Sequence, residues 1–137
     1  MKIYFAGAIR GGRNDAVLYY EIVRQLQKHG EVLTEHVADT ELGILGQDIG
    51  DRKIHDRDLD WLKESDYLVA EVTTPSLGVG YEIGKATEWG KRVLCLYRPE
   101  NGRSLSAMIS GSSEVTVREY QSATELTEIF EEFLHDK

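Results

Sequence analysis

Short apolar runs alternate along this chain with longer segments in which apolar residues recur at helical spacing, and this alternation constrains the fold most. A run such as Tyr67 to Val72 is typical of a buried strand. Strands and helices that alternate in this way build parallel sheets with helices on both faces. The 137 residues show no internal repeat and no linker. The sequence therefore predicts one α/β domain over residues 1–137, a doubly wound parallel sheet of about five strands.

The expected elements follow from hydrophobic period and from turn residues. Ser122 and Glu125 have the spacing of a capping box at the start of the last helix, and Asp51 is expected to cap an earlier one. The segment from Glu35 to Gly50 is expected to be a mobile loop with a short helical turn. The expected strands cover residues 2–6, 31–34, 66–72, 92–97 and 115–120, and the expected helices cover about 15–29, 51–64, 105–109 and 123–135, with one more that ends near Trp89.

The stretch from Ser76 to Gly84 follows the third strand and leads into a helix, at the edge where open α/β sheets bind ligands. Glu82 is therefore expected in the first turn of that helix. A carboxylate there meets the positive end of the helix dipole, which favours the ionised form and suits a base, a ligand or a nucleophile. The alternative is an ordinary first-turn acid, and position alone does not separate the two.

A glycine-rich turn, Gly7-Ala8-Ile9-Arg10-Gly11-Gly12-Arg13, follows the first strand. Glycines let backbone N–H groups approach an anion, and the next helix start adds its dipole, so this turn is a candidate phosphate cradle. Its spacing fits neither G-x-G-x-x-G nor G-x-x-x-x-G-K-[ST], which disfavours NAD and Walker-type ATP binding. The alternative is a plain tight turn with exposed arginines.

Asp58 is a second candidate carboxylate, because its expected helix face otherwise carries Ile54, Trp61 and Leu62. An acid among inward-facing apolar residues is costly unless it is paired or functional. If the helix register is off by one residue, Asp58 is instead a solvated charge. Two carboxylates beside a phosphate cradle suggest chemistry at a sugar carbon, where one attacks the anomeric carbon and the other assists the leaving group.

Composition excludes several classes of protein. Sixteen basic against 24 acidic residues give a formal net charge of −8, which opposes binding of a nucleic-acid polymer through its phosphates. No stretch is apolar enough to span a membrane, and the chain starts directly with a strand, so we expect a cytoplasmic protein.

The histidines at 29, 36, 55 and 135 include no pair with helical metal-ligand spacing, and no metal site or cofactor is expected. Cys95 lies in an apolar run and is expected to be a buried, inert thiol.

Three other features have both a functional and a packing interpretation. Tyr4 could place its hydroxyl under the crevice, although a tyrosine on a sheet more often serves packing. His36 ends the second strand near the crevice and could contact a ligand. The serines from Ser104 to Ser113 are either flexible surface residues or donors to a phosphate, in the same subunit or across a dimer. The neighbouring Met108 and Ile109 slightly favour the dimer.

With these residues assembled, nearly the whole chain resembles the 2′-deoxynucleoside 5′-phosphate N-hydrolases of the nucleoside 2-deoxyribosyltransferase superfamily. The most specific motifs are Pro75-Ser76-Leu77-Gly78-Val79-Gly80-Tyr81-Glu82 and Leu105-Ser106-Ala107-Met108. The resemblance also covers residues 4–13, 33–37 and 54–62. It implies a flavodoxin-like homodimer that hydrolyses the bond between base and deoxyribose in deoxynucleoside monophosphates.

The resemblance also implies a role for each site residue. Glu82 matches the nucleophile that forms a covalent deoxyribosyl-phosphate intermediate, Asp58 the acid that assists departure of the base, and Tyr4 the residue that orients the nucleophile. Ala6 and Ala8 stand where family members often carry serine or cysteine, which leaves phosphate affinity and base preference open. The matched substrate-contacting positions are Gly7, Ala8, Ile9, Arg10, Gly11, Gly12, Arg13, Tyr19, His36, Ser76 and Gly78, with Ser106, Ala107 and Met108 reaching the phosphate site of the neighbouring subunit.

Two rival functions remain open from the sequence. A deoxyribosyltransferase would pass the same intermediate to a second base, and a nucleotide-binding sensor would use the fold without turnover.

Overall fold

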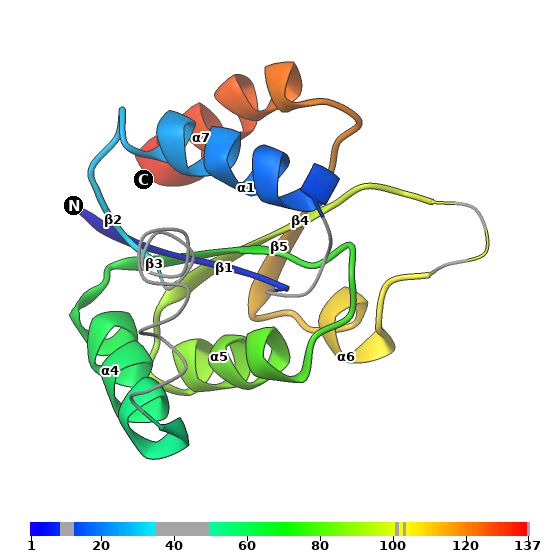
Figure 1. Ribbon diagram of the computed structural model, residues 1–137. Coiled ribbons are helices and arrows are strands. Elements are labelled where there is room, and N and C mark those ends of the chain that lie inside the picture. Colours follow the sequence, from blue (N-terminus) through cyan, green and yellow to red (C-terminus); the bar gives the residue numbers. More distant parts are fainter. Residues whose placement is uncertain (9–12, 35–49, 101, 103, 137) are drawn as a thin grey trace.

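The computed structural model describes residues 1–8, 13–34, 50–100, 102 and 104–136 (Figure 1). Its centre is a five-stranded sheet in the order β2-β1-β3-β4-β5, with every neighbouring pair parallel. This confirms the expected doubly wound sheet. The expectation for the segment between Glu35 and Gly50 lies almost entirely outside the described residues. The strands are β1 Lys2–Gly7, β2 Glu31–Leu33, β3 Tyr67–Glu71, β4 Arg92–Tyr97 and β5 Val115–Glu119.

Helices cover both faces of the sheet (Figure 1). Helices α1 (Arg13–Leu26) and α7 (Leu126–His135) lie on one face, and α4 (Asp51–Glu64) and α5 (Leu77–Glu88) lie on the other. The short α6 (Ala107–Ser110) contacts β5. A 3₁₀ turn, Ala123–Glu125, precedes α7 and carries the expected capping box. Helix α1 ends three residues before His29, and Gly50 instead of Asp51 is the N-cap of α4.

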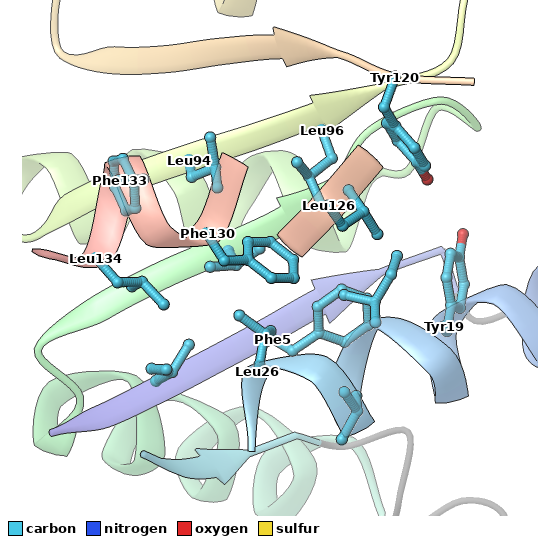
Figure 2. Packing of buried hydrophobic residues seen from close by; sticks show 14 residues of the cluster. Phe5, Tyr19, Leu26, Leu94, Leu96, Tyr120, Leu126, Phe130, Phe133 and Leu134 are labelled. Carbon is cyan, nitrogen blue, oxygen red and sulfur yellow. The ribbon is translucent and has the colours of Figure 1, made fainter. Parts of the chain in front are cut away.

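Two apolar cores lie between these layers, because successive strand residues point to opposite faces. In β3, Val69 packs toward α1 and α7, whereas Leu68 and Ala70 pack toward α4 and α5. Figure 2 shows the first core, in which Phe5 and Phe130 lie between the sheet and its covering helices. Burial on both faces explains why the central strands read as continuous apolar runs.

The sheet register determines where the functional loops begin. Gly7 at the end of β1 pairs with Glu71 at the end of β3, and Glu71 pairs with Leu96 of β4. The segments that follow β1 and β3 therefore start side by side at one edge of the sheet. In the described part of the chain, no helix is long and apolar enough to cross a bilayer.

Candidate active site

A cavity of about 660 Å³ lies at this edge, between the ends of β1 and β3 and the helices α4 and α5. Both candidate carboxylates line it, as does the start of the glycine-rich turn. The structure thus brings together residues from β1, α4, α5 and the turn that follows β3, as expected for a ligand site at the carboxyl ends of parallel strands. The lining residues are Gly7, Ala8, Ile54, His55, Asp58, Leu59, Thr74, Pro75, Ser76, Leu77, Gly78, Val79, Tyr81 and Glu82.

Glu82 lies one turn deeper in its helix than the sequence predicted. Ser76 is the N-cap of α5, and its side-chain oxygen accepts a hydrogen bond of 3.3 Å from the N–H of Val79. The helix therefore begins at Leu77, and Glu82 belongs to its second turn. Placement in the first turn was wrong, and because the helix dipole acts mainly there, it does not govern the charge of Glu82.

Burial governs the charge of Glu82 instead. The side chain is 6% exposed, and desolvation raises its pKa from 4.5 to about 7. The hydroxyl of the buried Tyr4 donates a hydrogen bond to Oε2, which lowers the pKa, and the nearby charge of Asp58 raises it. A carboxylate with few partners is a better nucleophile than one that is fully solvated. Glu82 therefore exchanges its proton near neutral pH, and its ionised form faces the cavity.

Asp58 is buried in α4, whereas its neighbours Asp56 and Asp60 are exposed. This excludes the alternative helix register and confirms that Asp58 faces inward. The Nε of Arg57 lies 3.0 Å from Asp58 Oδ1, and the guanidinium of Arg57 lies over the ring of Trp61. Asp58 thus lies in the same cavity as Glu82, with the guanidinium of Arg57 beside it.

The other end of the cavity offers donors for an anion. Because the Ser76 hydroxyl oxygen accepts from Val79, its own hydrogen is directed elsewhere and can be donated. The first N–H groups of α5, at Leu77 and Gly78, have no partner within the helix. A helix N-terminus with a hydroxyl donor is a suitable place for a phosphate.

Gly7, which lines the cavity, packs against the ring of Tyr19. A Cβ on Gly7 would lie 3.0 Å from the ring of Tyr19, so only glycine fits without displacing that ring. Tyr19 is buried against Phe5 and does not line the cavity, and burial raises its pKa to about 12. Ile9, Arg10, Gly11, Gly12 and His36 lie outside the described residues, as does the side chain of Arg13.

A buried polar network beside the cavity was missed by the sequence reasoning. Glu71 is fully buried and accepts hydrogen bonds from the N–H of Thr73, at 2.7 Å, and from the hydroxyl of Tyr120. Arg98 lies 3.5 Å from Glu71 and 3.0 Å from Asp15, and its backbone N–H donates to the Thr73 hydroxyl. The network fixes the turn that leads to Ser76. An acid at the end of an apolar strand was the signal that could have revealed it.

Ser106 and Met108 line a second groove of about 390 Å³, together with Ser76 and Leu77, whereas Ala107 between them does not. Ser106 is the N-cap of α6, and its hydroxyl oxygen accepts from the N–H of Met108 at 3.2 Å. Leu77 and Met108 are 96% and 82% exposed. The groove thus continues from the Ser76 end of the cavity and has two exposed apolar side chains on its rim.

One group of metal-ligand side chains lies far from this site. His29 Nδ1 is 2.9 Å from His135 Nε2, which is 3.9 Å from a carboxylate oxygen of Glu131. The three ligand atoms lie within 4.8 Å of one another, and this is the one such group among the described residues. It joins the end of α7 to the turn after α1, at the opposite end of the strands, so it has no direct part in the chemistry of the cavity.

The chain is similar to known proteins in sequence and in structure. A family model described as nucleoside 2-deoxyribosyltransferase matches residues 3–120. A 5-hydroxymethyl-dUMP N-hydrolase of Tetraodon nigroviridis is 54% identical, with 100% of this chain and 99% of the relative covered. The human 5-hydroxymethyl-dUMP N-hydrolase is 58% identical, with 82% and 66% covered. A putative 2′-deoxynucleoside 5′-phosphate N-hydrolase of Nematostella vectensis is 58% identical, with 88% and 85% covered.

Solved structures share the fold. A CMP N-glycosidase of Clostridium botulinum superposes with a TM-score of 0.66 at 19% identity, covering 96% of this chain and 99% of the other. A 2-deoxyribosyltransferase of Bacillus psychrosaccharolyticus gives a TM-score of 0.66 at 17% identity, covering 93% and 90%. At these identities the likeness bears on the arrangement of the layers alone.

Proposed function

Because the chain belongs to the nucleoside 2-deoxyribosyltransferase family, we propose that it is a glycosidase that hydrolyses the N-glycosidic bond of 2′-deoxynucleoside 5′-monophosphates. Its products are the free base and 2-deoxyribose 5-phosphate. The names of its relatives support this reaction and make 5-hydroxymethyl-dUMP the first substrate to test. No cofactor enters the proposed reaction.

The observation that carries the proposal is the pair of buried carboxylates in one cavity. An oxygen of Glu82 attacks C1′ while the bond from C1′ to the base breaks, and the bonding electron pair leaves with the base. Asp58 gives its proton to the departing base, and the resulting carboxylate is stabilised by Arg57 at 3.0 Å. Tyr4 orients Glu82 through the hydrogen bond from its hydroxyl.

A water molecule completes the reaction. It attacks C1′ of the covalent intermediate and gives a proton to the Asp58 carboxylate, and the ester bond to Glu82 breaks. Both carboxyl groups then have their original protonation states. A deoxyribose lacks the 2′-hydroxyl that would disfavour positive charge at C1′, so this carboxylate pair can act without a metal.

The 5′-phosphate has its place at the Ser76 end of the cavity. Ser76, the first N–H groups of α5 and the turn that begins at Gly7 and Ala8 would supply the donors. Arg10 and the rest of the glycine-rich turn, with His36, stay predicted contacts. Local donors of this kind allow a chain of net charge −8 to hold an anionic substrate.

The reaction can be tested on a panel of deoxynucleoside monophosphates that includes 5-hydroxymethyl-dUMP. We expect free base by chromatography, together with 2-deoxyribose 5-phosphate. Glu82→Gln is expected to lower base release by about 10⁴-fold, because the nucleophile is lost, while the monophosphate still binds. Glu88→Gln, on the exposed end of the same helix, is the matched control. Substantial residual activity in Glu82→Gln would contradict the nucleophile assignment, and binding without base release by the wild type would favour a sensor.

The description of the matched family makes a transferase the second candidate. In that reaction a free base, instead of water, attacks the intermediate. Incubation with a monophosphate and a foreign base separates the two, because only a transferase makes the exchanged nucleotide in quantity.

The homodimer is also a proposal. The groove lined by Ser106 and Met108 is continuous with the Ser76 end of the cavity and has exposed apolar side chains on its rim, which suits a second copy whose Ser106 to Met108 segment reaches the phosphate. We expect Ser106→Ala to weaken phosphate recognition. If the site is shared between subunits, a mixed dimer of one Glu82→Gln chain and one Ser106→Ala chain contains one intact site. Its activity should then exceed the average of the two variant homodimers. If each site lies within a single chain, the mixed dimer should only reach that average.

Two features of the whole chain bear on its setting. The negative net charge disfavours a nucleic-acid polymer as a partner. Cys95 is a free, buried thiol, and burial raises its pKa to about 12. An inert free thiol suits the reducing cytoplasm, which we propose as the compartment.

A further inference from the structure

A polar pair of side chains bridges the two helices that form the mouth of the cavity. His55 of α4 and Tyr81 of α5 both line the cavity, and the His55 Nε2 lies 3.1 Å from the Tyr81 hydroxyl oxygen. The rings lie 5.7 Å apart. Tyr81 is 48% exposed, so packing alone does not explain why the pair is held at this position. The mechanism described above uses neither residue.

The position of the base follows from Asp58. If Asp58 gives its proton to the departing base, the base must lie against α4. Residues three and four positions apart on a helix lie on one face, about one turn from each other. Ile54 and His55 therefore lie next to Asp58 along the wall that the base contacts, and Ile54 and Leu59 make its apolar part. A base that lies along this wall is next to His55 and, beyond it, to the hydroxyl of Tyr81.

The hydrogen bonds of His55 determine what Tyr81 offers to a ligand. The His55 Nδ1 lies 2.9 Å from a carboxylate oxygen of Asp56, which can only accept. The proton of a neutral imidazole therefore lies on Nδ1, and Nε2 accepts from the Tyr81 hydroxyl. This arrangement fixes the hydroxyl rotor, so that the lone pairs of the Tyr81 oxygen are free to accept a hydrogen bond from the cavity.

We infer that Tyr81 is a specificity-determining residue that accepts a hydrogen bond from a donor group on the edge of the base, and that His55 is its positioning residue. The inference rests on the proposed function of the cavity. The donor is an exocyclic O–H or N–H group, such as the hydroxyl of a 5-hydroxymethyl substituent. A base with a methyl group at the same position leaves the Tyr81 oxygen without this partner.

The matched substrates are 5-hydroxymethyl-dUMP and dTMP, which differ by one hydroxyl on the carbon at position 5. We expect Tyr81→Phe to lower the ratio of kcat/KM for these two substrates by about tenfold, the usual effect of one lost hydrogen bond. His55→Ala is expected to lower the same ratio. The ratio for the double variant should be no lower than the ratio for Tyr81→Phe, because His55 acts through the tyrosine hydroxyl. Tyr20→Phe, at an exposed position of α1, is the control and should leave the ratio unchanged.

The outcomes separate this inference from the proposed function. If the wild type releases no base from either substrate, the proposed function fails. If the wild type hydrolyses the monophosphates but Tyr81→Phe changes both substrates equally, or neither, the assignment of Tyr81 is overturned while the function stands. If the double variant loses as much of the kcat/KM ratio as the two single variants together, His55 contacts the substrate independently. Its positioning role is then overturned. Thermal unfolding of each variant shows whether it has kept its fold.

Discussion

Glu71 and Glu82 are buried glutamates at the same edge of the sheet, and each accepts a hydrogen bond from a tyrosine hydroxyl. Their other partners differ. Glu71 also has the N–H of Thr73 and the guanidinium of Arg98, which itself pairs with Asp15. Among the residues that the structure describes, Glu82 makes no ion pair, and it lines the cavity whereas Glu71 does not. One carboxylate is saturated with partners, and the other has capacity left for a substrate.

This difference separates an acid with a structural role from the acid that we propose as the nucleophile. Removing a carboxylate from water costs several kcal/mol unless charges and donors replace the lost hydration. For Glu71 the protein supplies those partners, and the network holds the turn from Thr73 to Ser76 in place. For Glu82 it supplies one hydrogen bond and a second acid, and the cost of burial is seen in a pKa of about 7. Burial alone therefore does not mark a glutamate as a catalytic candidate, whereas burial without a counterion beside a cavity does.

The largest expected loss of stability concerns Glu71. Glu71→Gln removes one charge of a buried ion pair and places an amide donor beside Tyr120 or Thr73. We expect the free energy of unfolding to fall by about 3 kcal/mol, as for other broken buried pairs, measured by urea denaturation at pH 7. Glu88→Gln, which changes an exposed acid in the same way, should have almost no effect. A stability loss below about 1 kcal/mol would show that the partners of Glu71 do not offset its burial.

Glu82→Gln is expected to raise the free energy of unfolding, whereas Glu71→Gln lowers it. The pKa of Glu82 is raised on folding from 4.5 to about 7. Its contribution to stability is therefore complete below pH 4.5, declines as the pH rises toward 7 and is absent above it. A neutral glutamine avoids this loss and still accepts from Tyr4. The variant should thus be more stable than the wild type by about 3 kcal/mol at pH 8 and by less than about 1 kcal/mol at pH 5.

Denaturation curves of both proteins at the two pH values check this expectation. An equal difference at pH 5 and pH 8 would mean that the gain does not come from titration of Glu82. If Glu82→Gln is no more stable than the wild type at pH 8, the Glu82 carboxylate already has partners that offset its burial. The contrast with Glu71 would then be lost.

The fold could be predicted because its signals are local. Apolar runs such as Val93 to Tyr97 lie between helical segments, and the same run becomes β4. Asp58 could be found in the same way, since an acid on an inward face breaks a local pattern. The start of α5 was misplaced because Leu77-Gly78-Val79-Gly80 contains two poor helix formers. Burial of Val79 and Ile83 against the sheet overrides that propensity.

The network of Glu71 could not be predicted, because its partners are distant in sequence. Tyr120 lies 49 positions away and Arg98 comes from the segment after the next strand. Only the sheet order brings these side chains together. The pKa of Glu82 could not be predicted for the same reason, because it depends on how deeply α5 packs and on the position of Tyr4.

The smallest expected effect compares the two tyrosines. The Tyr4 hydroxyl stabilises the ionised form of Glu82 and lowers its pKa. Without that hydroxyl the pKa rises further, by roughly one unit for one hydrogen bond.

Because the proposed nucleophile must be ionised, kcat/KM of the wild type should fall tenfold per pH unit below about 7. Tyr4→Phe should move this limb upward by roughly one pH unit. Tyr120→Phe removes the hydroxyl that contacts Glu71 and should lower stability while leaving the limb in place. A shift of the limb in both variants would mean that the two glutamates are electrostatically coupled, and a shift in neither would assign the limb to a group other than Glu82.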